Sequence, residues 1–231
     1  MTDSTAVALD ASAIETLKGV TTATLTTILL KKGLRNVWMR GAMPLRSDQE
    51  RVVGPAFTFR FVPAREDLAT PASWSSPIST RAAIEAMPEG AFAVIDAMGV
   101  SDAGVFGDIL CARMVKRKAV GMVTDGVVRD LEGVLGAGLP VWCRGAAAPP
   151  SVAGLTFVGW EETVGCGGVC VIPGDTIVAE HANQSRPLLL DELTRRDPTR
   201  PPRGARAQVQ RQKQQCDWTT EPRWHGEILR Q

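Results

Sequence analysis

The pattern of apolar and polar positions predicts helices first and then a long strand in the first third of the chain. Residues 10–33 carry apolar side chains at helical spacing, and Gly33 follows as a C-terminal cap. In residues 52–63, phenylalanines at every second position alternate with Thr58 and Arg60, which is typical of a strand. The chain therefore begins with helical structure and continues into a half-buried strand.

The middle of the chain repeats strand and helix in alternation. The expected elements are a short helix over 79–87, strands over 91–99, 119–126 and 139–145, and helices over 107–118 and 129–135. Strands separated by helices pair in parallel. Further short strands over 155–160, 167–174 and 175–180 favour a β-rich second layer or a closed barrel. The sequence thus predicts an α/β fold with a mixed central sheet.

Composition changes after about residue 184. Residues 185–231 carry ten Lys and Arg against six Asp and Glu, are rich in Pro and Gln, and lack apolar periodicity. Such a composition does not support a packed core. We therefore expect one domain over 1–184 and a divergent basic tail over 185–231, largely disordered apart from a turn of helix near 188–193.

Overall composition excludes several classes of function. The chain has 44% apolar and 22% charged residues and a net charge of +1, which argues against nucleic-acid and membrane partners. It contains no apolar run long enough to cross a membrane and no signal-peptide pattern at its N-terminus. Five scattered cysteines, among them Cys166 and Cys170 without zinc-ribbon spacing, fit a reduced protein, and we expect a cytoplasmic location.

Missing residue types narrow the chemistry further. The chain has no Tyr, and its two histidines, His181 and His225, lie at or beyond the end of the predicted domain. Catalysis in the domain must therefore proceed without a histidine base, a histidine ligand or a tyrosine acid, which argues against Ser-His-Asp and Cys-His nucleophiles. No Gly-rich nucleotide loop follows a predicted strand either. Carboxylates, Arg, Lys, backbone N–H groups and a metal ion remain.

The strongest candidate site combines Gly107-Asp108-Ile109-Leu110 with Arg129-Asp130. The intervening residues predict one helix and one buried strand, which return the chain to the same end of the sheet. Ligands of α/β sheets bind at the carboxyl ends of strands, where helices begin. Asp96 and Asp125 also follow predicted strands at that end. Two carboxylates and one guanidinium are therefore expected to meet there.

These residues suit a small anionic substrate and a divalent metal ion. The N–H groups of Ile109 and Leu110 lie in the first turn of a helix, where a carboxylate can bind them, and Arg129 can form a fork with the same carboxylate. Asp130 can bind Mg²⁺, and Asp108 can orient a water molecule. The alternative is that Asp108 only caps its helix, and that Asp130 only interacts favourably with the positive end of the dipole in the first turn of its own helix. Spacing alone does not decide between the two.

At these residues the chain resembles a known family. The segment GDILCARMVKRKAVGMVTDGVVRD is similar to the signature of the RraA-like proteins and the 4-hydroxy-4-methyl-2-oxoglutarate (HMG/CHA) aldolases. Flanking segments agree with it, namely TTATLTTILLKKGLRN, VVGPAFTFRFVPAREDL, AIEAMPEGAFAVIDA and GCGGVCVIPGDTIVA. The resemblance extends over about residues 12–180.

The resemblance implies a class II pyruvate aldolase with an α-β-β-α sandwich-like domain, assembled as a homotrimer or hexamer. Asp130 would hold Mg²⁺, Mn²⁺ or another divalent metal ion. Arg129, with Gly107, Asp108, Ile109 and Leu110, would bind the 2-oxo acid substrate, and Asp108 and Arg129 would act in catalysis. The implied reaction is retro-aldol cleavage of a 4-hydroxy-2-oxo acid to pyruvate and an oxo compound, with oxaloacetate decarboxylation as a side activity. The alternative is a non-catalytic regulator that binds ribonuclease E.

Two features depart from the family pattern. Family aldolases often carry an acidic residue three positions after the metal-binding aspartate, where this chain has Gly133, with Glu132 one position earlier. The resemblance also stops at about Glu180, where family members usually continue into another strand and a long helix. Both departures concern the surroundings of the metal site.

Overall fold

The computed structural model describes residues 10–180 and, for the backbone, residues 188–190. Most of the predicted tail over 185–231 therefore lies outside the described residues. No helix in the described part of the chain has the length and apolar character needed to span a bilayer.

Helices and strands alternate through the described chain. The helices are α1 (Ala11–Lys18), α2 (Thr22–Lys31), α3 (Thr80–Ala86), α4 (Asp108–Lys116) and α5 (Leu131–Ala137), with 3-10 turns η1 (Pro71–Ser75) and η2 (Ser151–Ala153). The strands are β1 (Met43–Pro44), β2 (Val52–Pro63), β3 (Phe92–Asp96), β4 (Gly121–Thr124), β5 (Val141–Cys143), β6 (Leu155–Trp160), β7 (Val164–Cys166), β8 (Val169–Val171), β9 (Thr176–Ala179) and β10 (Leu188–Leu190).

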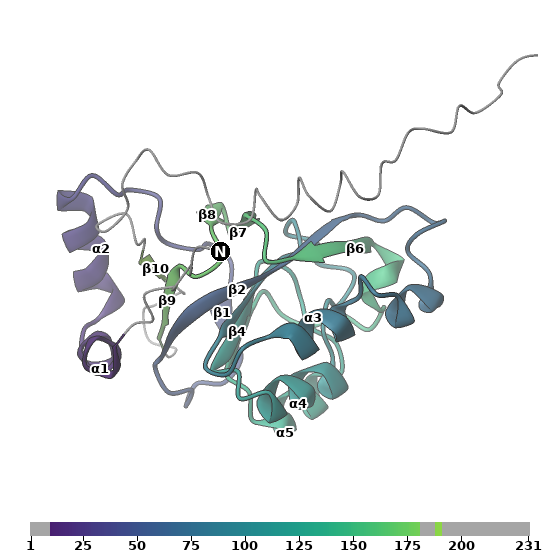
Figure 1. Ribbon diagram of the computed structural model, residues 1–231, viewed down its shortest axis with the longest axis horizontal. Coiled ribbons are helices and arrows are strands. Elements are labelled where there is room, and N and C mark those ends of the chain that lie inside the picture. Colours follow the sequence, from purple (N-terminus) through teal and green to yellow (C-terminus); the bar gives the residue numbers. More distant parts are fainter. Residues whose placement is uncertain (1–9, 181–187, 191–231) are drawn as a thin grey trace, which may run out of the picture. The chain divides into compact units, whose positions relative to one another are not determined.

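A mixed sheet forms the centre of the fold, as the sequence predicts. Its order is β1-β5-β4-β3-β2-β9-β10, and β6 also pairs with β2. Strands β2, β3, β4 and β5 pair in parallel, whereas β1, β6, β9 and β10 join antiparallel. The parallel pairing follows from the connections, because α3, α4 and α5 each return the chain to the same end of the sheet (Figure 1).

Both faces of the parallel sheet are covered, and alternate residues of each strand point to opposite sides. Ala93 and Ile95 of β3 belong to one apolar cluster, which includes side chains of α3, α4 and α5. Phe92 and Val94 belong to another, which contains Trp142 and the apolar residues of the β7–β8 hairpin. Burial on both faces explains why these strands read as nearly continuous apolar runs.

Helices α1 and α2 pack on the other half of the sheet, beside β2 and β9. Asp10 and Thr21 cap them, accepting hydrogen bonds from backbone N–H groups three residues later. After α2, Gly33 has a φ of +87° and the Leu34 N–H bonds to the Leu29 carbonyl at 2.9 Å. This arrangement is a Schellman motif, so the predicted role of Gly33 in ending the helix is confirmed.

A buried carboxylate links these helices to the sheet. Glu180 follows β9 and is only 4% exposed. It forms an ion pair with Arg51 and accepts hydrogen bonds from the backbone N–H and the hydroxyl of Thr22, while its backbone carbonyl accepts from Trp142 Nε1 at 2.8 Å. One residue therefore joins the start of α2, the start of β2 and the core of the sheet.

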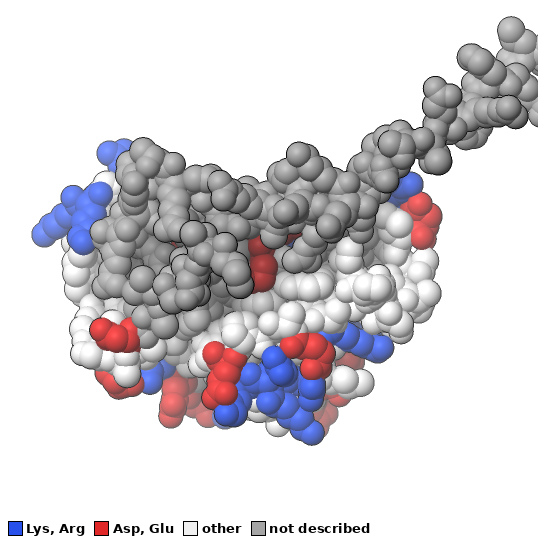
Figure 2. All heavy atoms as spheres, viewed as in Figure 1, with Lys and Arg blue, Asp and Glu red and all other residues white. Residues whose placement is uncertain are grey.

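Helices α3 and α4, with the turns that follow them, carry paired charges on their outer surface. Arg113 binds Glu85 through two hydrogen bonds of 2.6 and 2.7 Å, and Lys118 binds Glu89 at 2.8 Å. Figure 2 shows basic and acidic side chains interleaved on this side of the molecule. Exposed ion pairs of this kind contribute little to stability. Because opposite charges alternate, this surface has no large patch of a single charge.

Some sequence expectations differ from the structure. Helix α5 begins at Leu131 rather than at residue 129, because Asp130 has a left-handed backbone. Residues 188–190 form a strand paired with β9 rather than a turn of helix. Of the extra strands, β6 and β9 join the main sheet, and β8 forms a small second layer with β7. The main sheet is an open path, so the closed-barrel alternative is wrong.

Replacing Glu180 tests its role in joining the helices to the sheet. We expect Glu180→Ala to lower the free energy of unfolding by about 3–5 kcal/mol, because it leaves Arg51 without its buried partner. Guanidinium denaturation measures this, with Glu50→Ala at an exposed neighbouring position as the control. An effect equal to that of the control would mean that the buried pair does not hold the two parts together.

Candidate active site

The carboxyl ends of β3 and β4 hold two carboxylates that organise the loops around them. Asp125 accepts hydrogen bonds from the N–H groups of Ala97 at 2.8 Å and Gly167 at 3.3 Å. Asp96 accepts from Met98 at 3.1 Å and Gly165 at 3.0 Å. Burial raises the pKa of the Asp125 carboxyl, although the backbone N–H bonds oppose this rise. These aspartates hold the loop after β3 and the β7–β8 hairpin in place.

The loop before α4 lies directly against the segment before α5. A Cβ atom on Gly104 would be 2.7 Å from Arg129 Cβ, and one on Gly107 would be 2.7 Å from Asp130 Oδ2. A hydrogen bond from the Arg129 N–H to the Phe106 carbonyl, at 2.9 Å, fixes this contact. The structure therefore brings the two predicted halves together, and glycine permits the close approach.

Asp130 presents its carboxylate beside Arg129 rather than to its own helix. Its backbone is left-handed, with a φ of +52°, and its side chain makes no capping hydrogen bond to α5. Instead, Asp130 Oδ2 accepts from Arg129 Nε at 2.9 Å, and both side chains remain partly exposed. A non-glycine residue in this conformation is uncommon and points to a constraint at the site.

Asp108 occupies the first position of α4, next to this pair. Its Oδ1 accepts a hydrogen bond from the Ile109 N–H at 2.7 Å, so one of the two predicted amide donors is already used. One oxygen of Asp108 therefore binds the start of its own helix, as the capping alternative predicts, and the other oxygen does not. The neighbouring Leu110 N–H has no partner among residues 10–180 and is the donor that remains for a ligand.

Gly133 accounts for where Asp108 sits. A Cβ at position 133 would lie 2.6 Å from Asp108 Cβ and 3.0 Å from its Oδ2. Helices α4 and α5 therefore meet at their first turns through a glycine. Any side chain at position 133 would need Asp108 to move, so the glycine and the position of Asp108 are coupled.

The arrangement fits a hard divalent cation that keeps most of its water. Asp130 offers carboxylate oxygens that its helix does not use, and oxygen ligands are what Mg²⁺ prefers. Across the described ranges, no three His, Cys, Asp or Glu side chains are grouped to form a closed metal site. An ion held by Asp130 would therefore complete its shell with water and substrate oxygens.

The buried cysteines do not supply a competing nucleophile. Cys111 lies one turn into α4, and burial, with the nearby charge of Asp108, raises its pKa to about 12. Burial also raises the pKa of Cys143 and Cys166. A thiolate is the reactive form of cysteine, so these three thiols stay neutral and inert near neutral pH.

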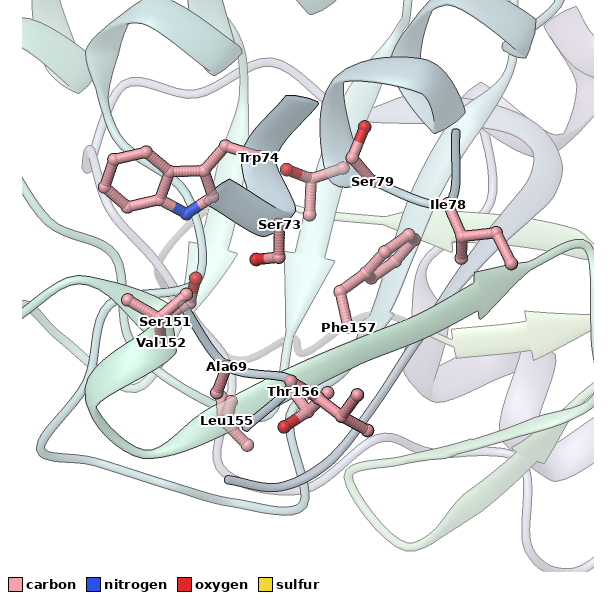
Figure 3. Close-up of a pocket in the computed structure, with 12 residues that line it drawn as sticks. Ala69, Ser73, Trp74, Ile78, Ser79, Ser151, Val152, Leu155, Thr156 and Phe157 are labelled. Atoms are coloured by element: carbon pink, nitrogen blue, oxygen red, sulfur yellow. The ribbon is translucent and has the colours of Figure 1, made fainter. Parts of the chain in front are cut away.

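A separate hollow lies between η1, the start of α3 and the start of β6. Trp74, Ile78 and Phe157 border it, with Ser73 and Ser79 among the polar side chains (Figure 3). None of the predicted site residues lines it. The carboxyl end of the sheet therefore remains the better candidate.

One cation at this end was not predicted from the sequence. Arg144 comes directly after β5, and its backbone N–H bonds to the Gly126 carbonyl at 2.8 Å. The available signal was an arginine followed by glycine after a buried strand. Its side chain lies against Gly41 and Gly99, which are far away in the sequence, so these contacts could not be read from the sequence.

Comparison with known proteins gives a family match over most of the chain. The family model RraA-like, described as Aldolase/RraA, matches residues 9–182. This confirms the resemblance inferred from the signature segments.

Individual relatives match over shorter stretches or at moderate identity. "Protein DlpA" of Legionella pneumophila is 28% identical over 130 residues, which are 56% of this chain and 20% of that protein. "Putative 4-hydroxy-4-methyl-2-oxoglutarate aldolase" of Halalkalibacterium halodurans is 31% identical over 135 residues, 58% of each chain. The matched region thus spans one fifth and somewhat over half of these two relatives.

A solved structure shares the fold over nearly its whole length. Streptomyces coelicolor RraAS2, described as an unusual member of the RNase ES inhibitor RraA protein family, superposes with a TM-score of 0.70 and 27% identity. The match covers 91% of this chain and 95% of that one. The mixed α/β architecture predicted from the sequence is therefore confirmed.

Two glycines of α5 separate helix propensity from the contact with Asp108. Nothing lies within 4 Å of a Cβ on Gly136, so Gly136→Ala should raise the free energy of unfolding by up to about 1 kcal/mol. Gly133→Ala has the same gain in propensity but collides with Asp108 Cβ, and we expect it to lower stability. Denaturant midpoints compare the two, and equal stabilisation would contradict the close α4–α5 contact.

The Cys111 thiol predicts a loss of stability at high pH. An unfolded cysteine ionises near its ordinary pKa, whereas folded Cys111 stays protonated up to about pH 12. The unfolded state therefore binds fewer protons between about pH 9 and 12, and stability falls there by about 1.4 kcal/mol per pH unit for this group. Cys111→Ala should show a shallower fall in urea denaturation across this range. Parallel curves for the two proteins would contradict the raised pKa.

Proposed function

Since the chain belongs to the RraA-like (Aldolase/RraA) family, we propose that it is a carbon–carbon lyase of the class II pyruvate aldolase type. The proposed reaction is divalent-metal-dependent retro-aldol cleavage of a 4-hydroxy-2-oxo acid to pyruvate and an oxo compound. Oxaloacetate decarboxylation is the proposed side activity, because it proceeds through the same pyruvate enolate. The observation that carries the proposal is the Arg129–Asp130 pair, held against the start of α4 and turned away from its own helix.

The start of α4 and Arg129 supply the proposed binding site for the 2-oxo acid end of the substrate. The free Leu110 N–H and the positive end of the helix favour a carboxylate. Arg129 uses its Nε for Asp130, so its terminal N–H groups remain to bind the carboxylate and the 2-oxo group. Gly107 lets the Asp130 carboxylate and Arg129 lie against the backbone before α4, because a Cβ atom there would be 2.7 Å from Asp130 Oδ2.

Asp130 is the proposed ligand for Mg²⁺, Mn²⁺ or another divalent cation. Such an ion, when bound, supplies Lewis-acid polarisation of the 2-oxo group and stabilises negative charge on its oxygen. Arg129 adds a fixed positive charge at the same oxygen. Its attraction to that oxygen grows as the enolate forms and the oxygen becomes more negative. The ion pair between the two residues keeps the carboxylate and the guanidinium on the same side of the substrate.

Proton transfers in this proposal depend on water held by Asp108. Cleavage removes the proton of the C4 hydroxyl, breaks the C3–C4 bond and leaves pyruvate as its enolate. Protonation at C3 then gives pyruvate, so the overall reaction needs no redox partner. Asp108 Oδ1 is occupied by the Ile109 N–H, and Oδ2 is the oxygen that remains to orient a water molecule.

Assembly as a homotrimer or hexamer is part of the same proposal. Ile109 and Leu131, in the first turns of α4 and α5, are 76% and 41% exposed although both are apolar. Exposed apolar side chains next to the site offer a contact surface for a neighbouring subunit.

A regulatory role is the second candidate. RraAS2, which shares the fold, is described as a member of an RNase inhibitor family. A protein of this kind would bind ribonuclease E through its surface and would not need the Asp130 carboxylate. The two functions separate by whether pyruvate is formed.

The direct test measures pyruvate release with Mg²⁺ and 4-hydroxy-4-methyl-2-oxoglutarate or oxaloacetate, coupled to lactate dehydrogenase. We expect activity in the wild type and a loss of about 10²–10³-fold in kcat/KM for Asp130→Asn. Asparagine tolerates the left-handed backbone, so this variant should keep the fold. Asp102→Asn, at an exposed position of the same loop region, is the matched control. Pyruvate release no faster than with the metal ion alone, at equal rates for wild type and Asp130→Asn, would exclude the proposed lyase activity.

A further inference from the structure

Asp125 is a buried carboxylate at the carboxyl end of β4, and the proposed reaction does not use it. It directly follows β4 and is 5% exposed. Its Oδ1 accepts a hydrogen bond from the Ala97 N–H at 2.8 Å, and its Oδ2 accepts one from the Gly167 N–H at 3.3 Å. One side chain therefore joins three segments of the chain: the loop after β3, its own segment after β4 and the turn of the β7–β8 hairpin.

The first two of these segments carry the two halves of the candidate site. Residues 97–107 lead from β3 to the start of α4, and residues 126–130 lead from β4 to the start of α5. Next to Asp125 the two segments are in close contact, because a Cβ on Gly126 would lie 2.7 Å from Ala97 Cβ. The hydrogen bond to Asp125 and this contact fix where the two segments begin.

The same two segments stay in contact up to the site. The Val105 N–H bonds to the Val127 carbonyl at 2.9 Å. Farther along, the Arg129 N–H bonds to the Phe106 carbonyl, also at 2.9 Å. These bonds form a short parallel ladder between the loop before α4 and the segment before α5. Asp125 closes the opposite end of this ladder, so the relative position of the two halves depends on it.

The ionised form of Asp125 suits this role, because an ionised carboxylate only accepts hydrogen bonds, whereas a protonated one also donates. Burial raises the pKa of Asp125, the two backbone N–H groups oppose this rise, and the charge of Asp96 on β3 adds to it. Two other groups act in this region. Cys166 of β7 stays neutral because burial raises its pKa, and Arg144, after β5, places a positive charge near Cys166.

We propose that Asp125 is a positioning residue, which holds the loop before α4 against the segment before α5. The assignment rests on the proposed function of the Arg129–Asp130 pair. That pair lies on one segment, whereas Asp108 and the Leu110 N–H lie at the end of the other. A 2-oxo acid needs groups from both segments at once, so its binding depends on their relative position.

Calorimetric titration of oxalate at saturating Mg²⁺ tests this without turnover, because oxalate resembles the pyruvate enolate. We expect Asp125→Ala to bind oxalate about 10- to 100-fold more weakly than wild type, because holding the segments together then leaves buried N–H groups without an acceptor. Asp125→Asn should recover part of the affinity, since its amide oxygen can still accept from Ala97. Glu180→Gln, which neutralises a buried carboxylate on the far side of the sheet, should bind oxalate as wild type does.

The pH dependence of oxalate binding separates the role of the charge from a purely structural one. In wild type, the affinity should fall as the pH drops through the pKa of Asp125, which burial places above the ordinary value for an aspartate. Asp125→Asn cannot take up this proton and should lack the step. Glu180→Gln should keep it, even where its melting temperature is lower.

The outcomes distinguish the positioning role from the proposed reaction. If folded Asp125→Ala binds oxalate as tightly as wild type, or if Asp125→Asn keeps the pH step, Asp125 does not position the site. Should thermal melting show that Asp125→Ala is unfolded, wild type and Asp125→Asn alone decide. An Asp125-dependent affinity without pyruvate release from 4-hydroxy-4-methyl-2-oxoglutarate supports the positioning role and rejects the lyase. Pyruvate release with unchanged oxalate binding in both variants does the reverse. Wild type that binds no oxalate overturns the positioning role, whatever the pyruvate assay shows.

Discussion

The candidate site depends on the close contact between two backbones at the carboxyl end of the sheet. Gly104 and Gly107, before α4, lie so near Arg129 and Asp130 that any Cβ atom would collide with them. The contact brings the first turn of one helix to a carboxylate and a guanidinium from the next strand–helix connection. Asp130 takes a left-handed conformation there and gives up the usual capping role. Packing, rather than the preference of any single residue, therefore forms the constellation.

The rest of the fold holds this contact in place. Parallel pairing of β3, β4 and β5 aligns the connections that carry the site. Asp125, buried beneath them, binds the loop after β3 and the β7–β8 hairpin through backbone N–H groups. Such buried acceptors are costly unless fully bonded, so they fix the loops in a single arrangement. Glu180 does the same for the N-terminal helices, at the far side of the sheet.

Much of the architecture follows from sequence pattern, because the parallel strands are continuous apolar runs separated by helices. The departures arise where distant contacts decide. Strand β1, with two residues, carries no pattern of its own, and residues 188–190 form a strand because β9 is their partner. The pairing of the Ile109 N–H with Asp108 and the role of Gly133 are not readable from spacing. Arg144 depends on glycines 103 and 45 positions away in the chain, so its unusual environment appears only in three dimensions.

The central claim is that Asp130 and Arg129 form one site for a divalent cation and a 2-oxo acid. Water proton relaxation with Mn²⁺, titrated with and without oxalate as an analogue of the pyruvate enolate, tests this most directly. We expect oxalate to strengthen Mn²⁺ binding to the wild type, Asp130→Asn to lose Mn²⁺ binding, and Arg129→Gln to bind Mn²⁺ but to lose the effect of oxalate. Binding of Mn²⁺ to Asp130→Asn as tightly as to the wild type would contradict it.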